Sequence, residues 1–215
     1  MPGSPTPPKL SLPRVAAAIA NRRLTVVAFG SSTTEGVGAS APAATYPARL
    51  EVELRAALPG VAVTVVNRGQ GGEEAEDFQR RVPDVIGDRP DLVIFQTGTN
   101  DAIRSVPLAR FEELTRAAIA AFRNAGSDTV LMEPQFCRAI EEAPDFMSYI
   151  ELVRTLGAEY GLPVIRRYEL MKVWLASGLL TPTELITPDD LHMADGGYRE
   201  LAKAAAKIII ESCRA

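Results

Sequence analysis

The stretch VVAFGSSTTEG, residues 26–36, decides how the rest of the chain is interpreted. Its four apolar residues, 26–29, indicate a buried strand that ends at Gly30. Because glycine lets the backbone turn sharply, the hydroxyl side chains after it would lie at the end of that strand. They fit either a cap on the next helix or a nucleophile held at a strand end.

Apolar runs rich in β-branched and aromatic residues recur along the chain, and each predicts a strand. The five predicted strands are residues 25–29, 61–66, 92–96, 129–132 and 163–165. Apolar residues at helical spacing predict helices within residues 46–58, 111–122, 146–160 and 198–209. The first helix is expected to begin after Thr45 and to stop at Pro59-Gly60.

Strands that alternate with helices indicate an α/β fold whose parallel sheet is covered on both faces. Right-handed crossovers then give a three-layer α/β/α arrangement of flavodoxin type with five parallel strands. A chain of 215 residues without an internal linker favours one domain, residues 23–215, after a Pro-rich arm and lead-in segment, residues 1–22. Sites in such folds lie where the strands end, so the strand exits are the candidates for chemistry.

Composition excludes several classes of function. The net charge is −4 and no basic run is present, which argues against a nucleic-acid partner. No apolar segment reaches the roughly 18 residues that span a membrane. No signal peptide is present as written, so we expect a cytoplasmic protein, or a periplasmic or secreted one if the N-terminus is processed or engineered. The sequence carries no signal for the oligomeric state.

The exits of the second and third strands contain groups that can stabilise negative charge. Residues 67–72, Asn-Arg-Gly-Gln-Gly-Gly, expose backbone N–H groups that can bind an oxyanion, although a flexible turn fits as well. After the third strand, Asn100 can donate its amide N–H to a developing charge. The alternative there is an Asx-turn, with Asp101 capping the next segment of the chain.

The segment TPDDLHMADGGY, residues 187–198, contains His192, the only histidine of the chain. Asp189 stands three residues before it and can hold the imidazole in one tautomer, which leaves the other ring nitrogen free as a base. The alternative is a structural or surface histidine. A zinc site with several histidines is excluded, and no metal is expected.

These four segments resemble, in order, the four sequence blocks of the SGNH hydrolases, also called the GDSL family of lipases and esterases. The resemblance covers nearly the whole chain from Thr25 to Ile210. The matching blocks are Gly30-Ser31-Ser32 for Gly-Asp-Ser, Asn67-x-Gly69-x-Gly71-Gly72 for Asn-x-Gly-x-Ser-Gly, Gly98-Thr99-Asn100-Asp101 for Gly-x-Asn-Asp, and Asp189-x-x-His192 for Asp-x-x-His.

The resemblance implies a role for each of five residues. Ser32 would be the nucleophile, His192 the base and Asp189 the residue that orients it. The backbone N–H groups of Ser32 and Gly72, with the side chain of Asn100, would form the oxyanion hole. No metal and no organic cofactor are implied.

Two residues depart from the family pattern. Ser31 replaces the usual aspartate, which removes a charge beside Ser32 and adds a rival hydroxyl. Gly71 replaces the usual serine of the second block. Asp190 is a rival for the orienting acid, although its spacing to His192 is one residue shorter than that of the family.

The predicted function is a serine esterase that forms an acyl-enzyme on a Ser-His-Asp triad. The expected substrates are short acyl esters of a small molecule or a carbohydrate, acetylated carbohydrate included. An acyltransferase that uses the same site is the first alternative. A glycan- or lipid-binding module without turnover is the second.

Overall fold

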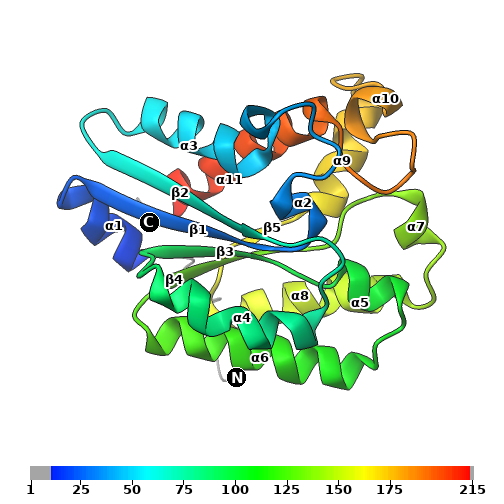
Figure 1. Cartoon of the computed structure of the whole chain (residues 1–215), viewed down its shortest axis with the longest axis horizontal. Helices are drawn as coiled ribbons and strands as arrows, with labels where there is room; N and C mark the ends of the chain where they lie inside the picture. Colours follow the sequence, from blue (N-terminus) through cyan, green and yellow to red (C-terminus); the bar gives the residue numbers. More distant parts are fainter. Residues whose placement is uncertain (1–10, 214–215) are drawn as a thin grey trace, which may run out of the picture.

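Five parallel strands form one sheet in the order β2-β1-β3-β4-β5 (Figure 1). The computed structural model describes residues 11–213. The strands are β1 (Arg23–Gly30), β2 (Ala62–Gly69), β3 (Leu92–Gln96), β4 (Asp128–Met132) and β5 (Val164–Ile165). This confirms the predicted α/β fold and all five predicted strands, whose ends differ from the prediction by at most three residues.

Helices cover both faces of the sheet, so the molecule has three layers (Figure 1). The helices α3 (Tyr46–Ala57) and α11 (Asp195–Cys213) lie on one face, and α4 (Ala75–Gly87), α6 (Leu108–Asn124) and α8 (Phe146–Tyr160) lie on the other. The remaining helical elements are α1 (Pro13–Ala20), α2 (Ser32–Glu35), η1 (Pro42–Ala44), α5 (Thr99–Ile103), α7 (Arg138–Glu141), α9 (Arg167–Ala176) and α10 (Pro182–Leu185).

The central strand β1 sends alternate side chains into two separate cores. Val26 and Ala28 belong to the core beneath α3 and α11, whereas Val27 and Phe29 belong to the core beneath α4, α6 and α8. This follows from the geometry of a strand, in which successive side chains point to opposite faces. Because both faces are buried, the strand is a continuous apolar run, and that run is the feature that predicted it.

Only α3, α6, α8 and α11 were predicted from the sequence, and α4 is the longest of the helices that were not. The segment Ala75–Gly87 is rich in charge and contains Pro83, yet it forms α4 because Phe78, Val82 and Val85 fall on one buried face. A capping box formed by Glu74 and Asp77 caps the N-terminus of α4. The predicted cap at Thr45 is confirmed, since its hydroxyl accepts a hydrogen bond from the backbone N–H of Ala48.

The lead-in segment forms another helix that was not predicted, α1. Leu12 and Val15 are buried in the core beneath α3 and α11, and the backbone N–H of Val15 donates to Asp128. Residues 1–10 of the predicted arm lie outside the described residues. The domain boundary at residue 22 stays a prediction. None of the helices between residues 11 and 213 has the length and apolarity needed to cross a membrane.

The strand exits gather at one end of the sheet. The helices α2, α5 and α7 and the loop that precedes α11 all lie at this end (Figure 1). Since parallel strands share one direction, segments far apart in sequence meet there. The candidate site is built from these segments.

Candidate active site

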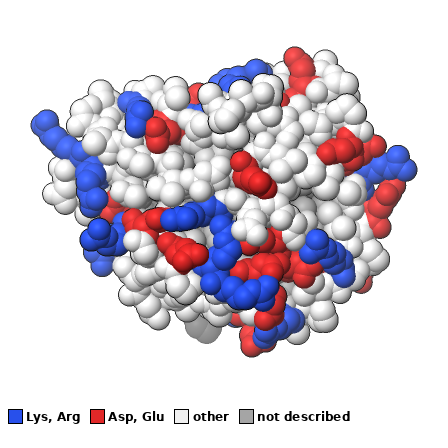
Figure 2. Space-filling model, in the orientation of Figure 1, with Lys and Arg blue, Asp and Glu red and all other residues white. Residues whose placement is uncertain are grey.

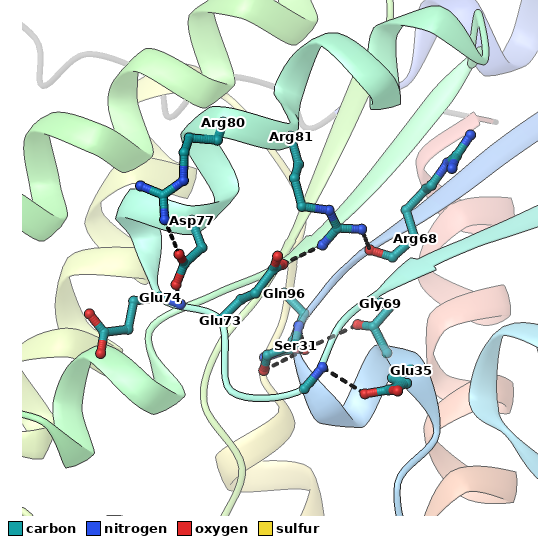
Figure 3. Close-up of polar contacts among 12 residues, drawn as sticks. Ser31, Glu35, Arg68, Gly69, Glu73, Glu74, Asp77, Arg80, Arg81 and Gln96 are labelled. Carbon is teal, nitrogen blue, oxygen red and sulfur yellow. Dashed lines mark hydrogen bonds and ion pairs between the residues drawn. The ribbon is translucent and has the colours of Figure 1, made fainter.

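The two adjacent serines have different surroundings. Ser31 is the N-cap residue of α2, and its hydroxyl accepts a hydrogen bond of 3.0 Å from the Gln96 side-chain amide at the end of β3 (Figure 3). The Gln96 carbonyl oxygen accepts in return from the backbone N–H of Ser31 and from the Thr34 hydroxyl. Within residues 11–213, the hydroxyl of Ser32 has no hydrogen-bond partner. The Ser31 hydroxyl is therefore engaged with the interior, whereas that of Ser32 is available.

The loop between β2 and α4 lies against Ser32. A Cβ atom placed on Gly71 would be 3.8 Å from the Cβ of Ser32. The next residue, Gly72, has a φ of +78°, a left-handed conformation that glycine adopts without strain. The Arg104 guanidinium fixes this loop further by donating a 2.9 Å hydrogen bond to the carbonyl oxygen of Gly72.

The Glu35 side chain lies beside position 71. Its carboxylate accepts a 2.6 Å hydrogen bond from the backbone N–H of Gly71 (Figure 3). A Cβ at position 71 would lie 2.8 Å from that carboxylate oxygen, which is closer than van der Waals contact allows. At position 71, where the family has a serine, this chain has a glycine, and the Glu35 carboxylate occupies the space beside it.

Two consecutive residues of α5 tether the same loop. The Asn100 side chain donates a 2.7 Å hydrogen bond to the carbonyl oxygen of Glu73, and Asp101 accepts one of 2.9 Å from the backbone N–H of Ala75. Within residues 11–213, no backbone N–H donates to the Asn100 side-chain oxygen, so the local Asx-turn considered as an alternative is not formed. A primary amide has two N–H groups, so the second one of Asn100 remains for another acceptor.

Asp101 is fully buried, and this changes its titration. Burial raises the pKa of its carboxyl group from 3.8 to about 6, although the hydrogen bond from Ala75 opposes the shift. Its Oδ2 atom has no hydrogen-bond partner among the described residues. The group therefore favours the neutral form more strongly than an exposed aspartate does.

Asp189 and His192 form a close pair in the loop before α11. The Nδ1 atom of His192 lies 2.6 Å from Oδ2 of Asp189. The other carboxylate oxygen accepts hydrogen bonds from the Thr187 hydroxyl and from the backbone N–H groups of Leu191 and His192. Burial alone would raise the pKa of Asp189, but these hydrogen bonds outweigh it and hold the pKa well below its usual range.

The rival acid, Asp190, does not face the imidazole. It adopts a φ of +58°, and its carboxylate lies 3.9 Å from the guanidinium of Arg138. The structure therefore pairs His192 with Asp189. Because an ionised carboxylate only accepts hydrogen bonds, Nδ1 carries the proton in this pair and Nε2 keeps its lone pair.

The loop after α2 connects the Ser32 segment with the histidine. The backbone N–H of Val37 donates to the carbonyl oxygen of Ser32, and the carbonyl oxygen of Val37 accepts from the Tyr198 hydroxyl. A Cβ placed on Gly38 would lie 3.3 Å from the Cβ of His192. No hydrogen bond joins Ser32 to His192 within residues 11–213. In catalytic sites this contact often tightens only when the substrate binds.

An apolar hollow of about 300 Å³ adjoins the histidine loop. Its lining includes Phe136, Leu175 and Leu185, together with Thr187 and Pro188, which directly precede Asp189. The described part of the chain contains no cluster of three histidine, cysteine, aspartate or glutamate side chains that could hold a metal ion.

Glu35, Gln96 and Arg104 support the candidate site, but none of them was predicted from the sequence to do so. For two of these residues, Gln96 and Glu35, a sequence pattern could have indicated the role. Gln96 is a polar residue at the end of a wholly apolar strand, and Glu35 stands three residues after Ser32, on the same side of a helix. No sequence pattern indicated the role of Arg104, because the residue that it contacts, Gly72, is 32 positions away in the sequence.

Comparison with known proteins places the chain among lipases and esterases. The sequence profile of the Non-GDSL lipase-like family matches residues 2–215. An acetylxylan esterase from Geobacillus stearothermophilus is 28% identical over 127 residues, which are 54% of this chain and 58% of that enzyme. The chain therefore matches somewhat over half the length of that relative.

Solved structures agree with this placement. The structure of a lipase/acylhydrolase from Enterococcus faecalis superimposes with a TM-score of 0.74 at 26% identity, over 86% of this chain and 95% of that one. A putative lipolytic protein of the G-D-S-L family from Desulfitobacterium hafniense gives 0.72 at 21% identity, over 86% and 99%. The second likeness shows a shared fold.

Proposed function

Because the chain belongs to the Non-GDSL lipase-like family, and with it to the SGNH-type hydrolases, we propose that it is a serine esterase. The observation that carries this proposal is the pair formed by Asp189 and the chain's only histidine, 2.6 Å apart. This pair leaves Nε2 of His192 as the basic atom. The available hydroxyl of Ser32, at the first position of α2, supplies the nucleophile.

Acylation begins when the Ser32 oxygen attacks the ester carbonyl carbon. His192 takes the hydroxyl proton on Nε2 and later gives it to the leaving alcohol, so the proton balance closes. Asp189 stabilises the imidazolium that exists between these steps. The low pKa of Asp189 supports this role, because it keeps the carboxylate charged. In the second half of the reaction, water attacks the acyl-enzyme with His192 again as the base, and the carboxylic acid is released.

The negative oxygen of the tetrahedral intermediate needs donors that are already in place. The backbone N–H groups of Ser32 and Gly72 and the second amide N–H of Asn100 are the proposed donors. The hydrogen bond from Asn100 to the carbonyl oxygen of Glu73 supports this assignment, because it ties Asn100 to the residue that follows Gly72. Such donors act without reorganisation during the reaction.

We assign the substrate class as short acyl esters, with acetylated carbohydrate foremost. The similarity to an acetylxylan esterase supports an acetyl group on a sugar. The exposed loops around the histidine leave room for a bulky alcohol, since Asp189 itself is half-exposed. The acyl group would face the loop formed by Gly71 and Gly72.

The test uses Ser31 as the internal control for Ser32. A fluorophosphonate probe is expected to label the wild type and Ser31→Ala but not Ser32→Ala. The same three proteins are assayed with acetylated xylo-oligosaccharides and with nitrophenyl esters of increasing chain length. Label that persists in Ser32→Ala, or a wild type that hydrolyses none of these esters, would refute the proposal.

A further inference from the structure

Arg167, the first residue of α9, is fully buried at the end of the sheet that holds the site. Its guanidinium donates to the carbonyl oxygen of Glu133 at 3.1 Å and to the side-chain oxygen of Gln135 at 2.8 Å. It makes no ion pair within residues 11–213, because Arg154 engages both carboxylate oxygens of Glu133. Burial lowers the pKa of Arg167 to about 10, so it still carries a charge at neutral pH.

Gln135 extends this contact in two directions. Its side-chain oxygen also accepts a 3.0 Å hydrogen bond from the Thr99 hydroxyl, directly before Asn100. Its side-chain N–H donates at 3.3 Å to the carbonyl oxygen of Leu191, directly before His192. A single buried amide therefore contacts both the segment of the proposed oxyanion donor and the segment of the proposed base.

The cost of this arrangement indicates that it serves more than packing. A buried cation that lacks a carboxylate partner and a buried amide both lose hydration, and an apolar side chain of similar volume would avoid that loss. Nη1 of Arg167 even lacks a hydrogen-bond partner among the described residues. What the polar groups provide is directional contact between two segments that are 92 residues apart, the start of α5 at Thr99 and the loop at Leu191.

We propose that Gln135 and Arg167 are positioning residues, which hold the Asn100 segment and the His192 segment in a fixed mutual orientation. The inference rests on the proposed esterase function for its kinetic consequence. Arg167 fixes the Gln135 side chain through its oxygen, and Gln135 in turn fixes the backbone beside the base. Neither residue is assigned contact with the substrate.

Gln135→Met tests the proposal because it keeps the volume and removes the amide. We expect kcat to fall by about 10- to 100-fold, the usual cost of misplacing a catalytic group through its support. KM for nitrophenyl acetate should change by less than about threefold, because binding of this small ester is not affected. The matched control is Gln79→Met, whose amide donates to the carbonyl oxygen of Leu114 between α4 and α6.

The imidazole signals in an NMR spectrum give a second readout, since they belong to His192 alone. They are expected to shift or broaden in Gln135→Met and to match the wild type in Gln79→Met. A folded Gln135→Met variant with kcat within about threefold of the wild type and unchanged imidazole signals would overturn the inference.

A second variant tests the proposal even if Gln135→Met does not fold. Thr99→Val removes the hydroxyl that donates to Gln135 and also accepts from Arg167 at 3.4 Å, and it is expected to lower kcat by about tenfold. If Gln135→Met does not fold, an unchanged kcat and unchanged imidazole signals in Thr99→Val contradict the proposal. A wild type without esterase activity refutes the proposed function instead, while the imidazole signals still decide the positioning role.

Discussion

Position 31 shows how a neutral pair replaces the charged residue of the family pattern. Gln96 both donates to and accepts from Ser31, so it satisfies the hydroxyl and the backbone N–H without a charge. A buried charge beside β3 would need its own compensation. The neutral pair holds the turn in front of Ser32 and leaves the next residue as the available hydroxyl.

The neighbouring acids Asp189 and Asp190 permit a matched comparison. Asp189→Asn is expected to lower kcat by about 10²- to 10⁴-fold, because an amide favours the wrong tautomer of His192. Asp190→Asn removes the same charge one residue away, where it faces Arg138, and should stay within about threefold of the wild type. Steady-state hydrolysis of nitrophenyl acetate measures both. Similar losses in the two variants would contradict the assignment.

At the scale of elements, the loop from Gly71 to Ala75 is held by side chains of two short helices. The carboxylate of Glu35, in α2, accepts a hydrogen bond from the backbone N–H of Gly71. Asn100, Asp101 and Arg104, in or directly after α5, contact Glu73, Ala75 and Gly72, respectively. A loop that begins with two adjacent glycines is flexible by itself, so these contacts are what fixes the direction of its N–H groups.

Asn100→Ala removes both a proposed donor and one of these tethers. Turnover is expected to fall by about 10²- to 10³-fold, the usual loss for one oxyanion donor. Circular dichroism should stay native, because Asp101 and Arg104 still hold the loop. The control is Asn124→Ala, an exposed asparagine at the end of α6. A loss of less than about tenfold in Asn100→Ala would make Asn100 a tether only.

At the scale of the molecule, the sheet lies between two apolar cores, and the surface outside them has mixed charge. Figure 2 shows Lys and Arg interspersed with Asp and Glu on the face that it presents, without an extended patch of one sign. Such a face offers no large basic surface for nucleic acid. A buried ionisable group affects the stability of the fold more than an exposed one does. Asp101 is a fully buried aspartate, and burial raises the pKa of its carboxyl group.

Asp101 makes the stability of the whole fold depend on pH. Its pKa is about 6 in the folded protein and 3.8 ordinarily, so the folded state binds the proton more tightly. Stability should then fall as the pH rises from about 4 to about 6, by on the order of 2 kcal/mol from this group, and change little above that range. Asp101→Asn should remove this part of the pH dependence.

Urea unfolding of the wild type and Asp101→Asn at pH 4 and pH 7 measures the effect. The variant should lose less stability than the wild type between the two pH values. Equal losses would show that Asp101 titrates alike in the folded and unfolded chains.

The strands, their parallel arrangement and the segments of the candidate site could be predicted from the sequence alone. These depend on local patterns: apolar runs of strand length, helical spacing and residues at fixed short separations. Asp189 and His192 belong to one turn, so their spacing predicted a pairing that the structure contains. The helix α4 escaped prediction because Pro83 and a high charge obscure its apolar face.

The folded structure was needed to show which of the two adjacent serine hydroxyls is bound to Gln96. Ser31 binds Gln96 across 65 residues of sequence, and Gly71 is matched to Glu35 across 36. The link from Arg167 through Gln135 to the loop of His192 has no sequence pattern at all. The physical reason is that a buried polar group must find a partner wherever packing places one, and packing depends on the whole chain rather than on neighbours in sequence.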